Sequence, residues 1–116
     1  MELGINSTPS VQPNEVEDLI QDGFVLVDVR EKDEWISGHH VSAIHIPMGE
    51  IMENMNSFHL NEKYIVVCRS GSRSARVTNY MISQDIEAYN MAGGMKELRN
   101  FTENIYDLEG NPGQII

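Results

Sequence analysis

The only cysteine of this 116-residue chain stands where a sulfur nucleophile could be made. Cys68 directly follows the apolar run 64–67, which predicts a buried strand, and a helical pattern begins near Ser72 and continues to about residue 84. A strand end, a short glycine-containing loop and a helix N-terminus bring backbone N–H groups to one place. Such groups, a helix dipole and nearby arginines stabilise a thiolate. The spacing therefore predicts a reactive cysteine rather than the inert core residue that a lone cysteine more often is.

The next five residues form the predicted anion-binding loop: Arg69, Ser70, Gly71, Ser72 and Arg73. Their N–H groups would build the cradle, and Gly71 permits a curl that other residues resist. The two serines either add hydroxyl donors or simply fit a tight loop. We expect Arg69 to reach outward to an anionic substrate and Arg73 to brace the loop, against a carboxylate such as Asp28, but the sequence does not separate these two roles.

Charge is distributed unevenly along the chain. The net charge is −10, yet residues 63–84 contain no acidic residue. The acidic balance argues against non-specific binding to nucleic acids or anionic membranes.

No apolar run approaches the ~20 residues of a membrane span, and the first residues lack the pattern of a signal peptide. A single cysteine forms no internal disulfide, which fits a reducing compartment. We therefore expect a cytoplasmic protein.

Short apolar runs alternate with helical patterns along the chain. Strands are predicted at 24–29, 41–46, 64–67 and 88–91, and helices at 13–22, 31–37, 48–56, 72–84 and 95–100. This alternation predicts an α/β fold with a parallel sheet covered on both faces. Ligands of such sheets bind beyond the carboxyl ends of the strands, where Cys68 stands. Residues 1–12 are expected to form an arm with at most a short strand near Val11, residues 13–100 the domain, and residues 101–116 a tail that packs on or extends it.

Four further motifs accompany the cysteine loop in a fixed order. The loop sequence Cys-Arg-Ser-Gly-Ser-Arg-Ser resembles the active-site loop of single-domain rhodaneses, which are sulfurtransferases that carry a cysteine persulfide. The likeness runs from about residue 13 to residue 99. The other similar segments are the strand ending in Asp28-Val-Arg30, the turn Glu34-Trp-Ile-Ser-Gly-His39, the strand end Ala43-Ile-His-Ile-Pro47, and Ala92-Gly-Gly94.

The resemblance implies a rhodanese-like fold, with a central parallel sheet of about five strands flanked by helices on both faces. It also implies that Cys68 takes sulfane sulfur from thiosulfate or a persulfidated protein and passes it to a thiol or to cyanide, without a cofactor. Asp28, Arg30 and His39 occupy motif positions of the family. We expect them to be supporting residues that hold strand ends and loops.

Other functions compete with sulfur transfer. A sulfur carrier or interaction module without turnover would use the same loop. Cysteine phosphatases of related fold place five residues between cysteine and arginine, whereas four separate Cys68 from Arg73. Arsenate reductases often need a second, resolving cysteine. His39, His40 and His45 could suggest a metal, but zinc sites normally add thiolates or carboxylates at defined spacing, so no metal is expected. The last two histidines depart from the family pattern and leave the shape of the pocket open.

Overall fold

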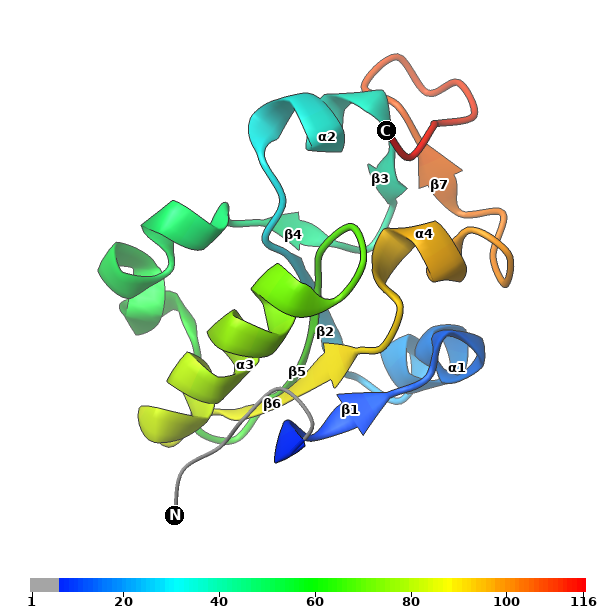
Figure 1. Ribbon diagram of the computed structural model, residues 1–116. Coiled ribbons are helices and arrows are strands. Elements are labelled where there is room, and N and C mark those ends of the chain that lie inside the picture. Colours follow the sequence, from blue (N-terminus) through cyan, green and yellow to red (C-terminus); the bar gives the residue numbers. More distant parts are fainter. Residues whose placement is uncertain (1–6) are drawn as a thin grey trace.

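Five parallel strands form the centre of the computed structural model, which describes residues 7–116; residues 1–6 of the predicted arm lie outside the described residues. The strand order is β1-β6-β5-β2-β4, and every neighbouring pair is parallel. The strands are β1 (Ser10–Val11), β2 (Val25–Asp28), β4 (Ile44–His45), β5 (Lys63–Val67) and β6 (Glu87–Met91). The predicted α/β architecture is confirmed, and the strand that carries Cys68 at its end is the central one (Figure 1).

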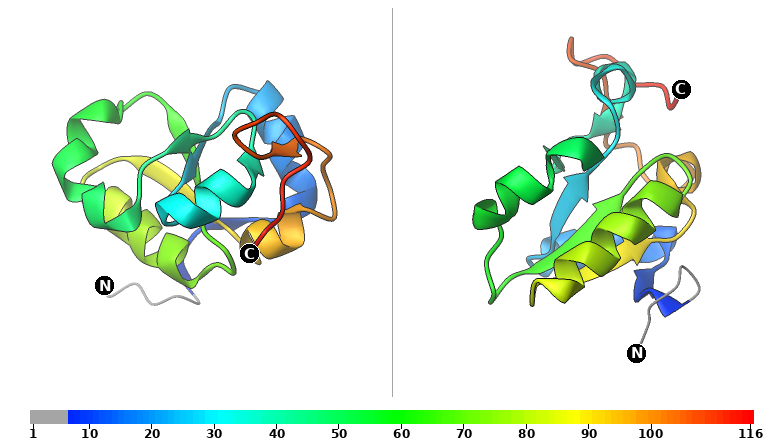
Figure 2. Two further views of the ribbon diagram at one scale, coloured as in Figure 1. Left: turned by 90° about the horizontal axis from the view of Figure 1, so that it is seen from above. Right: turned by 60° about the vertical axis from the view of Figure 1, so that its left-hand side comes forward.

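Helices cover both faces of this sheet (Figures 1 and 2). One face packs against α3 and the 3-10 helices η3 and η4, and the other against α1 and α4. Side chains of β5 alternate between the two cores, because successive residues of a strand point to opposite faces. Val66 and Cys68 face α3, whereas Ile65 and Val67 face α1 and α4. The helices are η2 (Pro13–Glu15), α1 (Val16–Gln21), α2 (Lys32–Ser37), η3 (Met48–Glu50), η4 (Met52–Ser57), α3 (Ser72–Ser83) and α4 (Gly94–Leu98).

Two predicted elements differ from those observed. The helix expected at 48–56 is the pair of 3-10 helices η3 and η4, in a stretch where glycine, asparagine and serine lower helix propensity. The strand expected at 41–46 is interrupted by a turn, because the N–H groups of Ser42 and Ala43 bond to the His40 ring and carbonyl. Only β4 joins the main sheet. The turn separates it from β3 (His39–His40).

The tail folds back onto the domain. Its strand β7 (Ile105–Tyr106) pairs with β3 in a two-stranded antiparallel sheet. The N–H of Gln114 bonds to the carbonyl of Ser37 at the end of α2. Figure 1 shows the chain ending between α2 and α4, close to the loop that follows β5. Within residues 7–116, no helix is both long and apolar enough to cross a membrane.

A fully buried ion pair closes the end of β2. Arg30 Nη2 lies 2.8 Å from Asp28 Oδ2, and both side chains are inaccessible to solvent. The same nitrogen donates to the carbonyl of Gly38 at 2.7 Å, which ties the strand to the end of α2. Two charges withdrawn from water depend on each other, since removing either leaves the other uncompensated.

The N-terminus of α4 supports the cysteine loop from one side. The N–H of Met95 donates to the carbonyl of Cys68 at 2.8 Å, and that of Lys96 to the carbonyl of Arg69 at 3.0 Å. This close approach requires glycine at position 94. A Cβ there would lie 2.2 Å from the carbonyl oxygen of Arg69, and the backbone φ of Gly94 is +66°.

We predict that Asp28→Asn strongly destabilises the protein, because Arg30 would keep a buried charge without its counter-ion. Breaking one partner of a buried pair typically costs about 3–5 kcal/mol. Urea unfolding followed by circular dichroism measures this difference. Glu53→Gln, at an exposed carboxylate, is the matched control. Equal unfolding free energies for the two variants would show that the pair does not support the fold.

We also predict that Gly94→Ala lowers the free energy of unfolding, because the new methyl group needs a strained φ and collides with the cysteine loop. Strain of this kind costs about 1–3 kcal/mol. Gly49→Ala is the control, since nothing lies within 4 Å of a Cβ at that position. If urea midpoints of the two variants coincide, the close contact between α4 and the loop is not required.

Candidate active site

The sulfur of Cys68 lies at the carboxyl end of the central strand, almost entirely withdrawn from solvent. Its residue is only 1% exposed. The N–H of Gly71 points at Sγ from 3.1 Å, and the hydroxyl of Ser74 lies 3.2 Å from it. The N–H groups of Ser70 and Ser74 complete the set of donors. The donors are therefore Ser70 and Gly71 from the predicted run 69–73, together with Ser74 in the first turn of α3.

Two opposing effects set the acidity of this thiol. Burial raises the pKa of Cys68, because a thiolate loses hydration in the protein interior. Hydrogen bonds from the Ser74 hydroxyl and from the N–H groups of Ser74, Gly71 and Ser70 lower it and outweigh burial, so that the pKa lies below its ordinary value. Hydrogen bonds to the charged form favour that form. The donor ring thus makes a buried sulfur more acidic.

Gly71 gives the loop its shape. Its φ is +114°, in the left-handed region that favours glycine. From this position its N–H faces the sulfur, while its carbonyl accepts the N–H of Ala75 and so begins α3. A residue with a side chain would resist this backbone conformation, and the ring of donors would open.

Arg73 braces the loop, but against a different carboxylate from the one predicted. Its two terminal nitrogens donate to the two oxygens of Glu34 at 2.8 and 2.9 Å. The prediction of Asp28 as partner is wrong, because Arg30 already occupies that carboxylate. The bond from Arg73 lowers the pKa of Glu34. Glu34 was part of a recognised motif, yet the sequence did not show that α2 would carry it to α3.

The remaining loop side chains face solvent. Arg69, Ser70 and Ser72 are exposed. Arg69 Nε donates to the main-chain oxygen of Ile116 at 2.8 Å, so the tail reaches the rim of the loop. An exposed guanidinium at the rim can exchange this oxygen for one of a bound anion.

The predicted supporting residues lie behind the loop, and none of them bonds to the sulfur within residues 7–116. Asp28 and Arg30 form the buried pair described above. His39 stacks on Trp35 with ring centroids 3.7 Å apart, and its Nδ1 donates to the Trp35 carbonyl. His45 also stacks on Trp35 and donates to the carbonyl of Arg30. These contacts fix the segment that follows β2.

Other histidine contacts are remote from the loop. His40 is buried and bonds through Nε2 to Glu17 of α1, while its Nδ1 accepts the N–H of Ser42. Among the described residues, no three histidine, cysteine, aspartate or glutamate side chains gather closely enough to hold a metal ion.

Two residues near the sulfur were not foreseen. Ser74 is fully buried, and Asn90 is 7% exposed. Helical side chains point back toward the N-terminus, which could have indicated Ser74 as a neighbour of the loop. Asn90 is a polar residue in β6, paired in register with Val66 of β5. Polar side chains near the carboxyl end of a parallel sheet are candidates for a site.

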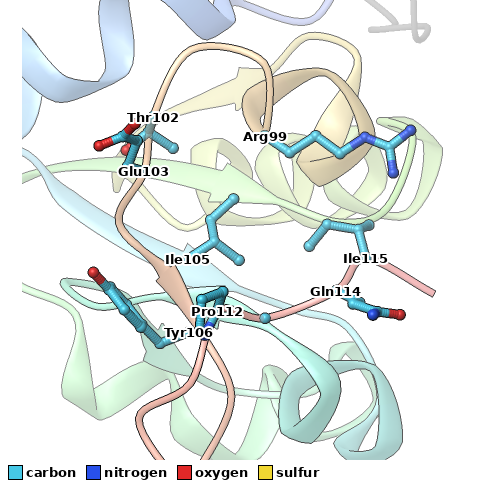
Figure 3. A pocket seen from close by; sticks show the side chains of 9 residues that line it. Arg99, Thr102, Glu103, Ile105, Tyr106, Pro112, Gln114 and Ile115 are labelled. Carbon is cyan, nitrogen blue, oxygen red and sulfur yellow. The ribbon is translucent and has the colours of Figure 1, made fainter.

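A surface hollow lies elsewhere. It has a volume of about 640 Å³ and is formed by the end of α4, β7 and the tail. Figure 3 shows Ile105, Pro112 and Ile115 around it, with Arg99 and Glu103 at its edges. None of its lining residues belongs to the cysteine loop, so the site is defined by its donors rather than by the size of a cavity.

Comparison with known proteins identifies relatives of this chain. The model of the Rhodanese-like domain family matches residues 12–101. "Putative sulfurtransferase YtwF" of Bacillus subtilis is 41% identical over 70 residues, which make up 60% of this chain and 68% of that protein. Thiosulfate sulfurtransferase GlpE of Pseudomonas fluorescens strain SBW25 is 28% identical over 87 residues, or 74% of this chain and 80% of that protein.

Solved structures agree with the sequence relatives. A rhodanese-like domain protein from Staphylococcus aureus superposes with a TM-score of 0.74 at 37% identity, covering 78% of this chain and 90% of that one. The family match includes the cysteine loop, the buried pair of β2 and the glycines that open α4. The prediction of the family is confirmed: this chain belongs to the rhodanese-like domain family.

Proposed function

We propose that this protein is a sulfurtransferase that carries sulfane sulfur as a persulfide on Cys68. The observation that carries the proposal is the ring of donors around Sγ, which favours an anionic sulfur in a buried position. A hydrogen bond to a charged group contributes about 1.5–3 kcal/mol, so this ring can offset part of the cost of burying the charge. Family membership and the names of the relatives support sulfur transfer in general.

The first half of the reaction loads the cysteine. The Cys68 thiolate attacks the outer sulfur of thiosulfate and forms a new S–S bond. The old S–S bond breaks, and its electron pair leaves with sulfite. Arg69 is suited to bind the sulfonate oxygens at the rim of the loop, in place of the Ile116 oxygen. This is covalent catalysis with a sulfur nucleophile.

The second half unloads it. A thiolate or cyanide attacks the outer sulfur, and the electron pair of the broken S–S bond returns to Cys68 as a thiolate. The same donors then stabilise the leaving group. Because the chain has one cysteine, the acceptor must come from outside.

The dimensions of the loop argue against phosphate chemistry. Four residues separate Cys68 from Arg73, and the N–H of Gly71 already lies 3.1 Å from Sγ. A phosphoryl group needs donors around three outer oxygens, whereas a persulfide adds one sulfur atom. Misplacement by ~1 Å can cost about a hundredfold in rate. A protein that takes up sulfur but turns over slowly with free thiosulfate would instead be a sulfur carrier.

We predict that Cys68→Ser abolishes transfer of sulfur from thiosulfate to cyanide and leaves the fold intact, because a serine hydroxyl is a poor nucleophile toward sulfur. Thiocyanate formation measures the activity, and circular dichroism the fold. Ser83→Ala, at an exposed serine of α3, should retain full activity. Thiocyanate formation by the Cys68 variant at a substantial fraction of the wild-type rate would refute the mechanism. So would phosphatase activity that depends on Cys68 and matches the sulfur transfer.

We further predict that Cys68 alkylates with a pH midpoint below the ~8.5 of a free cysteine. The donors lower its pKa, so a larger fraction of thiolate exists at neutral pH. The rate of alkylation should therefore begin to fall only at a pH below 8.5. The rate of reaction with iodoacetamide, followed by intact mass between pH 5 and 10, gives the midpoint. A midpoint at or above that of a free thiol would contradict stabilisation by the loop.

A further inference from the structure

The hydroxyl of Ser74 has one proton and three acceptors within reach. Its Oγ lies 3.2 Å from Cys68 Sγ, 3.2 Å from the carbonyl oxygen of Gly71 and 2.5 Å from Oδ1 of Asn90. A hydroxyl donates one hydrogen bond at a time. The sulfur therefore competes with the amide of Asn90 for this donor, and the shortest of the three contacts goes to Asn90.

The orientation of Asn90 is set by a second hydrogen bond. Its Nδ2 donates to the carbonyl of Gly71 at 3.2 Å, which turns Oδ1 toward Ser74. Reversing the amide would place two oxygens opposite each other at Gly71. Because Ser74 is fully buried and Asn90 nearly so, water does not readily replace either partner. The amide is thus held with its acceptor facing the hydroxyl.

We propose that Asn90 is a positioning residue. It accepts the hydrogen bond of the Ser74 hydroxyl while the sulfur of Cys68 is uncharged, and the hydroxyl turns from Asn90 to the sulfur when the sulfur is a thiolate. The role of this exchange in sulfur transfer rests on the proposed function. In the loaded protein the charge lies on the outer sulfur, and the inner sulfur is a weak acceptor. Asn90 then holds the hydroxyl proton. When an acceptor attacks the outer sulfur, the electron pair of the S–S bond moves to Sγ, and the Ser74 hydrogen bond turns to the new thiolate.

The charged side chains of the loop and of the elements that hold it are not altered by a change at Asn90. None of them forms a hydrogen bond with Asn90 among the described residues. They are Arg69 in the loop, Arg73 of α3 with its partner Glu34 of α2, and the Asp28–Arg30 pair at the end of β2. An effect of Asn90 on Cys68 must therefore pass through Ser74 or through the carbonyl of Gly71.

The test is the pH profile of alkylation of Cys68, which does not require sulfur transfer to occur. In Asn90→Ala the Ser74 hydroxyl no longer has to give up its bond to Asn90 to serve the thiolate, so the midpoint should fall by roughly 0.5–1 pH unit, which is the scale of one neutral hydrogen bond. In Ser74→Ala the midpoint should rise. When Asn90→Ala is added to Ser74→Ala, it should shift the midpoint by less than a third of the shift that it causes in the wild type, because the hydroxyl that connects Asn90 to the sulfur is absent.

Thr78→Val is the matched control. It removes another buried hydroxyl of α3 that bonds to the Ser74 carbonyl rather than to the sulfur, and it should leave the midpoint unchanged. Asn90→Leu, which keeps the number and branching of the side-chain heavy atoms, replaces Asn90→Ala if the latter does not fold. A midpoint that rises or stays constant in the Asn90 variant, or an equal shift with and without Ser74, would overturn the proposal. If the wild-type protein forms no persulfide, the proposed function is refuted, but this hydrogen-bond exchange is not.

Discussion

A negative charge on a buried sulfur is the constraint on which this structure depends. Cys68 is withdrawn from water, and burial by itself disfavours its thiolate. The hydroxyl of Ser74 and N–H groups of the loop and of α3 reverse that preference. They do so only while they converge within hydrogen-bond distance of one atom. The rest of the domain can be understood as the framework that keeps them there.

Three elements fix the loop from different directions. The start of α4 donates two N–H groups to loop carbonyls, at a distance that only glycine at position 94 permits. Glu34 of α2 holds Arg73 through two hydrogen bonds, and α2 is itself tied to β2 by Arg30. From the interior, Asn90 of β6 contacts both the loop carbonyl and Ser74. These contacts hold the donors in place in advance, which is the condition for electrostatic stabilisation of a charge.

The sequence predicted the parts of this arrangement that depend on local pattern. The strand before Cys68, the helix after it and the parallel sheet follow from hydrophobic periodicity and from alternation of elements. Contacts between residues that lie far apart in the sequence could not be predicted in this way. Arg73 and Glu34 are 39 positions apart, and Ser74 and Asn90 are 16 apart. Several carboxylates could have faced Arg73, and only the structure shows that Glu34 of α2 reaches it. The predictions of a strand at 41–46 and a helix at 48–56 differ from the structure because turn contacts of His40 and poor helix formers determine these segments.

The most direct test of a persulfide on Cys68 is the intact mass of the protein after incubation with thiosulfate and, separately, with a persulfide donor. We expect a gain of one sulfur atom on Cys68, absent when the thiol is alkylated beforehand. Dithiothreitol should remove that atom as sulfide and restore the original mass. No gain with either donor, or a gain that persists after Cys68 is blocked, would contradict the claim that this loop holds a persulfide.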